Sequence, residues 1–123
     1  MALKQVLDVY ELMDCESVSG KDIVALAQTA GIEDAASVTV KGPKGTTDFI
    51  KIRIPGKNGK QAGGTAPTLG LVGRLGGIGA RPERIGFVSD GDGALAVVAA
   101  AVKLGLMAQR GDRLNGDVII ATH

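Results

Sequence analysis

Residues 65–123 read TAPTLGLVGRLGGIGARPERIGFVSDGDGALAVVAAAVKLGLMAQRGDRLNGDVIIATH, and their pattern indicates an α/β unit. An apolar strand over about 68–72 leads into a glycine-rich loop that carries arginines. A second strand over about 85–89 ends at two acids, and an alanine-rich helix over about 93–107 follows. A last strand, about 117–121, completes a strand–helix–strand unit of the kind that joins parallel strands. Acids at a strand end, just before a helix, are a common place for chemistry in such proteins.

The first half of the chain predicts two helices and a β-hairpin. Apolar residues at helical spacing predict helices over about 2–14 and 19–31, the second with Ser19 as its N-cap. Alternating apolar and polar residues predict a hairpin over about 37–55 with one solvent-exposed face. No repeat divides the chain, so we expect 1–123 to form one α/β domain or the N-terminal subunit of a larger one.

The composition excludes several classes of function. A hydrophobic fraction of 45% fits a globular protein, and a net charge of +1 gives no basis for binding nucleic acid or an anionic membrane. The aromatic residues are only Tyr10, Phe49 and Phe87, so the chain has no stacking platform for bases. Cys15 is the single cysteine, which excludes an internal disulfide. Without a signal peptide or an apolar run of about 18–20 residues, we expect a cytoplasmic protein.

The first candidate site is the segment Ser-Asp-Gly-Asp-Gly that precedes the alanine-rich helix. Asp90 and Asp92 could hold a metal ion, or could act as general acid and base if one raises the pKa of the other. Ser89 precedes them and is a candidate substrate-binding residue. The alternative is structural, because Ser89, Asp90 or Asp92 could each serve as the N-cap of the helix.

The second candidate site is the glycine-rich loop before these acids. Backbone N–H groups at Gly76 and Gly77 could face an anion, and Arg74 and Arg81 could clamp it. The loop matches neither the dinucleotide-binding fingerprint nor a P-loop, so a substrate carboxylate is favoured over a nucleotide. The alternative is a tight turn whose glycines satisfy backbone geometry.

The single histidine, His123, is the last residue of the sequence. Adjacent parallel strands end at one edge of a sheet, so His123 is expected beside the same site as Asp90 and is a candidate catalytic residue. The alternatives are a frayed tail and a chain that has been cut after this residue.

Residues 89–98 and 114–120 resemble the middle of the co-catalytic zinc exopeptidases and deacylases. In that clan an Asp-x-x-Gly opens a helix after a strand, and the resemblance implies that Asp90 would be the metal-bridging ligand. The clan's earlier His-x-Asp motif is replaced here by Arg-Leu-Gly at 74–76, and its Glu-Glu pair would fall at or beyond His123. The resemblance therefore implies the clan's fold and a single divalent metal at most, rather than a two-zinc site.

Nearly the whole chain resembles the N-terminal part of an uncharacterised bacterial family of longer proteins. The resemblance is carried by the blocks at 41–51, 73–86 and 89–93 and by the Thr-His at 122–123. It implies that further polypeptide normally follows residue 123. A cut there could be an artefact, or it could be maturation that exposes a new N-terminal nucleophile on a second chain.

Together these patterns predict a three-layer α/β fold with a mixed sheet and helices on both faces. A second polypeptide or a C-terminal continuation would complete the sheet, and we expect an oligomer. The leading hypothesis is one subunit of a hydrolase that acts on amide bonds of small peptides or amino-acid derivatives. In it Asp90 or Asp92 is the general base or metal ligand, and Arg74 and Arg81 hold a substrate carboxylate. The alternatives are a non-catalytic binding subunit with a degenerate site and the N-terminal chain of a self-processed enzyme.

Overall fold

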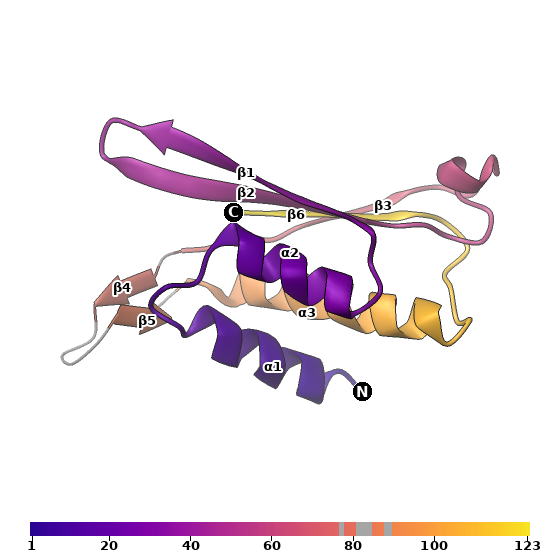
Figure 1. Ribbon diagram of the computed structural model, residues 1–123. Coiled ribbons are helices and arrows are strands. Elements are labelled where there is room, and N and C mark those ends of the chain that lie inside the picture. The colour runs from indigo at the N-terminus through magenta and orange to yellow at the C-terminus, as the bar shows by residue number, and fades with distance from the viewer. Residues whose placement is uncertain (77, 81–84, 88–89) are drawn as a thin grey trace.

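The computed structural model describes residues 1–76, 78–80, 85–87 and 90–123 (Figure 1). The chain forms helices and strands in the order α1 (Leu3–Met13), α2 (Gly20–Thr29), β1 (Asp34–Gly42), β2 (Gly45–Ile54), the short 3₁₀ helix η1 (Lys60–Ala62), β3 (Leu69–Val72), β4 (Ile78–Ala80), β5 (Ile85–Phe87), α3 (Asp92–Gln109) and β6 (Val118–Thr122).

The main sheet is mixed and has the strand order β1-β2-β6-β3. The strands β1 and β2 form the expected antiparallel hairpin, and β2 pairs antiparallel with β6. The strands β3 and β6 are parallel and are joined through α3. The last strand of the chain therefore lies inside the sheet, where it has a hydrogen-bonded neighbour on each side.

Side-chain alternation gives the sheet one buried face. Ile50, Ile52 and Ile54 of β2 point to the helices, and Val118 and Ile120 of β6 do the same. The register pairs Ile52 with Ile120, which are both fully buried at the centre of the core. Burial of each such side chain contributes roughly 1.5–3 kcal/mol to folding.

All three helices lie on that face of the sheet, with α2 and α3 against the strands and α1 outside them (Figure 1). The α/β class and the mixed sheet are as predicted, but the expectation of helices on both faces is not met in the described part of the chain. The reason is visible in β2, where Phe49, Lys51 and Arg53 alternate with the buried isoleucines and remain accessible. We call this second surface of the sheet the open face.

The strand before Asp90 differs from expectation. The sequence pattern places an apolar strand of the central sheet over about 85–89. In the described part of the chain β5 (Ile85–Phe87) pairs with β4, in a two-stranded sheet separate from the main one, and residues 88–89 of the predicted strand lie outside the described residues. Phe87 attaches this small sheet to α1, because its N–H donates to Asp14 Oδ1 over 3.0 Å and its ring packs edge-on against Tyr10.

The helix α3 passes a test of length and apolar composition for crossing a membrane. In the structure its small residues pack it into the core, with Ala94, Ala101 and Val102 among those buried. A Cβ atom built on Gly105 would lie 2.8 Å from the carbonyl oxygen of Ala30, so the turn after α2 rests directly on this glycine.

Candidate functional site

The end of β3 lies directly on the first turn of α3. The N–H of Ala94 donates to the carbonyl oxygen of Arg74 over 3.1 Å. A Cβ atom built on Gly73 would lie 2.2 Å from the carbonyl oxygen of Gly93, so the contact depends on glycine at position 73. The start of the glycine-rich segment thus packs the carboxyl end of a parallel strand against the N-terminus of the long helix, a common place for sites in α/β proteins.

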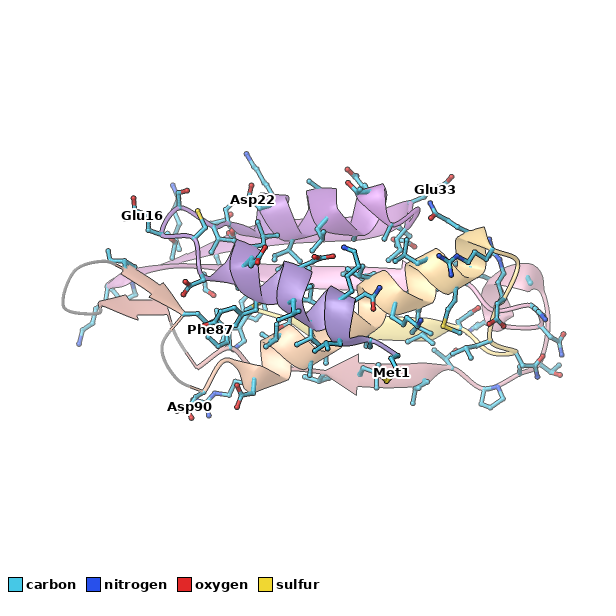
Figure 2. All side chains as sticks on the ribbon, turned by 90° about the horizontal axis from the view of Figure 1, so that it is seen from below. Met1, Glu16, Asp22, Glu33, Phe87 and Asp90 are labelled. Carbon is cyan, nitrogen blue, oxygen red and sulfur yellow. The ribbon has the colours of Figure 1, made fainter. Side chains whose placement is uncertain are left out.

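Asp90 lies at the entrance to this helix and is exposed; Figure 2 shows it beside the start of α3, with Phe87 nearby on the side of α1. Its φ of 54° is in the left-handed region, which aspartate tolerates better than most residues. The N–H of Gly76 donates to the Asp90 carbonyl oxygen over 2.6 Å, and a Cβ atom on Gly76 would lie 2.0 Å from the Asp90 Cβ. Gly76 is therefore needed for this close approach.

The structure does not use the described acids as helix caps. The N-cap of α3 is Gly91, and no side chain caps the helix by a hydrogen bond within the described residues. Asp92 is the first residue of α3, where its negative charge interacts favourably with the helix dipole. Both carboxylates thus remain at the helix entrance without the structural role that was the alternative interpretation.

The structure brings Arg74, Gly76, Asp90 and Asp92 together around the first turn of α3, and Arg74 is exposed there. Three other predicted site residues lie outside the described part of the chain, namely Gly77, Arg81 and Ser89.

A cavity of about 460 Å³ opens at the carboxyl end of β6. Ligand pockets are commonly about 300–1,000 Å³, so its size suits a small ligand. Leu75, which follows β3, and Ala94 in the first turn of α3 form part of its wall, so the cavity adjoins the segment that carries Asp90. The lining residues are Met13, Val18, Ser19, Gly20, Ile23, Thr46, Thr47, Asp48, Ile50, Leu75, Ala94, Val98, Thr122 and His123.

His123 borders this cavity, but its imidazole ring lies against Phe49, with ring centroids 5.8 Å apart. Phe49 belongs to the open face of the sheet, and alternation along β6 also assigns His123 to that face. The imidazole thus packs against Phe49, while His123 is also one of the residues that line the cavity.

Asp48 is a site residue that the sequence analysis missed. It shares the inner face of β2 with Ile50 and reaches the start of α2, where its Oδ2 accepts the Gly20 N–H over 2.7 Å. Its Oδ1 accepts the hydroxyl of Thr39 over 2.5 Å. The Thr39 hydroxyl and the Gly20 N–H lower the pKa of Asp48, so the carboxylate is ionised at neutral pH. The available signal was one acid in the alternating run of an otherwise isoleucine-rich strand.

Thr122 is a second missed residue. Only 6% of it is exposed, and its hydroxyl oxygen is buried without a hydrogen-bond partner among the described residues. A buried polar group left in this state costs about 1–3 kcal/mol. Because Thr122 lines the cavity, a ligand there could satisfy the hydroxyl.

The metal implied by the sequence resemblance does not fit a site built from these residues alone. The described part of the chain contains no group of three or more His, Cys, Asp or Glu side chains that could hold a metal ion. A zinc site takes three or four protein ligands, and Asp90 would supply one carboxylate. We therefore derive no chemical step through a metal.

Comparison with solved structures defines the class of protein as an α/β domain with the zinc-exopeptidase-like fold. The chain is similar to the "Bottromycin maturation enzyme BotP", with a TM-score of 0.61 and 22% identity over 98% of this chain and 29% of that one. A glutaminyl cyclase of an Acidobacteriales bacterium gives a TM-score of 0.49 and 18% identity over 98% of this chain and 42% of that one.

Residues 38–123 match the model of a family described as "Protein of unknown function (DUF1177)", and the chain belongs to that family. No curated protein matches the chain. The chain spans less than a third of the length of the maturation enzyme that it resembles.

Proposed function

We propose that this chain forms part of the substrate site of a hydrolase that acts on amide bonds of small peptides or amino-acid derivatives. One observation carries the proposal: the 460 Å³ cavity opens at the carboxyl end of β6, beside the first turn of α3 that Asp90 precedes. A cavity at this edge of an α/β sheet is the usual position of a substrate site. The fold is similar to that of a maturation enzyme, and this likeness supports an enzymatic site at this position.

In this proposal Asp90 is the general base. Its exposed carboxylate would accept a proton from a water molecule, whose oxygen then attacks the amide carbon. The carbon–nitrogen bond breaks, and the proton passes to the leaving amine. Asp92 supports the site through its charge, and Arg74, with Arg81, would hold a substrate carboxylate.

The test is Asp90→Asn in the protein expressed from the complete gene. Asparagine also tolerates the left-handed conformation, so the variant should fold normally while losing the base. We expect amine release from a panel of dipeptides and N-acyl amino acids to fall by about 10²-fold or more. Asp34→Asn, which removes an exposed acid of β1, is the matched control. Full activity of Asp90→Asn with an unchanged unfolding transition would overturn the assignment.

We also propose that further polypeptide from the same gene covers the open face. Val38, Phe49 and Val72 lie on this face, and at least half of each is exposed to solvent. The strand β3 forms an edge of the main sheet, with a row of unpaired backbone groups along its outer side in the described part of the chain. Apolar side chains around an unpaired strand edge are a surface that another element of structure would bury.

A further inference from the structure

The cavity beside β6 combines the carboxylate of Asp48, the buried hydroxyl of Thr122, which has no partner among the described residues, and an apolar floor. From this combination we infer that it binds a small aliphatic ligand with a protonated amine, the amine on Asp48 and the aliphatic part on the floor. The inference rests on the proposed function, because the ligand would be the amino end of the substrate. The inference adds to the proposed function the chemical class of ligand that the cavity binds.

The carboxylate of Asp48 is held in place and still has free capacity. Its two oxygens each accept one hydrogen bond, from Gly20 and Thr39, and an ionised oxygen can accept two. Thr39 and Gly20 lower its pKa most, and exposed Lys21 adds a smaller effect, so its charge is only partly balanced. No lysine or arginine lines the cavity among the residues that the structure describes. A cationic group is the complement of such a carboxylate.

The floor of the cavity selects the rest of the ligand. It is formed by branched and unbranched aliphatic side chains: Met13, Ile23, Ile50, Leu75 and Val98. No phenylalanine, tyrosine or tryptophan lines it within the described residues. Such a surface favours an aliphatic group over a planar, polar one such as a nucleobase.

Thr122 extends the recognition to a third group. Thr122 lines the cavity, and its buried hydroxyl has no partner among the residues that the structure describes, so it can donate a hydrogen bond to a carbonyl oxygen of the ligand. An amine, an aliphatic side chain and a neighbouring carbonyl are together the N-terminal residue of a peptide or an amino-acid amide.

The experiment compares two ligands of matched shape by calorimetry on the protein from the complete gene, at a pH below the α-amino pKa of roughly 8. L-leucinamide carries the cation, and N-acetyl-L-leucinamide lacks it. We expect saturable binding of leucinamide and binding of the acetylated probe that is about tenfold weaker or worse. Equal binding of the two probes, or no saturable binding of leucinamide, would overturn the inference without the need for any variant.

Two variants locate the binding. Asp48→Asn should weaken leucinamide binding by about ten- to a hundredfold, because a charge-assisted hydrogen bond is lost. Thr122→Val, which removes only the hydroxyl, should weaken it by about two- to tenfold. The control Asp34→Asn removes a carboxylate outside the cavity and should leave the affinity unchanged. Wild-type affinity in folded Asp48→Asn would remove Asp48 from the site and contradict the inference.

The inference and the proposed function can fail separately. Asp90→Asn should abolish turnover while leaving leucinamide binding intact, because Asp90 is not part of the cavity lining. If turnover persists in Asp90→Asn but leucinamide binding depends on Asp48, the proposed base is rejected and the amine site stands. If Asp90→Asn is inactive but leucinamide does not bind, the amine site is rejected alone.

Discussion

Asp117 shows how much one side chain organises at the residue scale. It is buried before β6, and its two carboxylate oxygens accept the N–H groups of Gly56 and Gln61 over 2.8 and 3.1 Å. A Cβ atom on Gly59 would lie 2.0 Å from its Oδ1, so the loop closes tightly around the acid. The glycine-rich loop between β2 and β3 is thereby attached to the sheet.

This arrangement predicts a pH dependence of stability. The N–H groups of Gly56 and then Gln61 lower the pKa of Asp117 in the folded state below its unfolded value of about 3.9. The stabilisation is therefore complete above about pH 4 and is lost as the pH falls through the lower folded pKa. In Asp117→Asn the side-chain amide has one acceptor oxygen and can accept only one of the two hydrogen bonds. The variant should therefore have a melting temperature several degrees lower than wild type at neutral pH. Its stability should also fall less on acidification.

Thermal unfolding followed from neutral to acidic pH checks this prediction. Asp112→Asn, at an exposed position nearby, controls for the loss of a negative charge. Parallel stability profiles for wild type and Asp117→Asn would show that protonation of Asp117 is not linked to folding and would contradict the predicted pH dependence.

At the scale of elements, α3 is constrained by what packs on it. Alanine normally stabilises a helix interior relative to glycine by about 1 kcal/mol. At Gly105 this gain is opposed by the Ala30 carbonyl oxygen and by Ile32 Cγ1, each 2.8 Å from the added Cβ atom. The carbonyl belongs to the backbone and cannot rotate away, so the clash outweighs the gain in helix propensity.

We therefore expect Gly105→Ala to destabilise the protein by about 1–3 kcal/mol, the range of overpacked sites. Ala96→Gly, at an exposed position on the same helix, measures the propensity effect alone and should cost about 1 kcal/mol. Urea unfolding of both variants checks the pair. A Gly105→Ala protein more stable than wild type would show that the turn after α2 yields to the added methyl group.

At the scale of the whole molecule, the main sheet has α-helices on one of its two faces in the described part of the chain. Figure 1 shows α1, α2 and α3 on one side of the main sheet. This side is the isoleucine face, and the open face carries Val38, Phe49 and Val72 at its surface.

If further polypeptide covers the open face, the protein made from the complete gene should contain more than the 123-residue chain. Denaturing mass spectrometry should show either one longer chain or this chain with a second polypeptide that begins after His123. The second result would identify maturation. In either case hydrogen exchange at Val38 and Val72 should be slower in the particle than in the isolated 123-residue chain. A particle that contains the 123-residue chain alone, with fast exchange on the open face, would contradict the proposal.

The local patterns of the sequence were informative where neighbours in the chain are also neighbours in space. Helical spacing and the Ser19 N-cap predict the first two helices close to where α1 and α2 lie. The Asp-Gly-Asp-Gly run predicts a helix entrance, and α3 begins there at Asp92. The glycine-rich turn was also expected beside this entrance, and the Gly76–Asp90 contact shows the two together.

The cavity could not be predicted in the same way, because its polar groups come from distant parts of the chain. Asp48 belongs to a hairpin in which polar side chains are expected to face solvent. It becomes a site residue only because the start of α2 at Gly20 lies next to it. Thr122 is one of a run of strand residues, and its unpaired hydroxyl depends on the packing around β6. The ring of His123 likewise faces Phe49 because of the strand register.

The sequence alone determined the α/β class, the three helices, the hairpin and the turn at Asp90, because hydrogen bonds and steric limits between near neighbours govern these features. The tertiary structure decided which face of the sheet the helices cover, which strands pair, and which side chains surround the cavity. These depend on strand register, since a shift of one residue exchanges the two faces of a strand. Because β6 lies between β2 and β3 in the sheet, Thr122 lines the same cavity as Asp48.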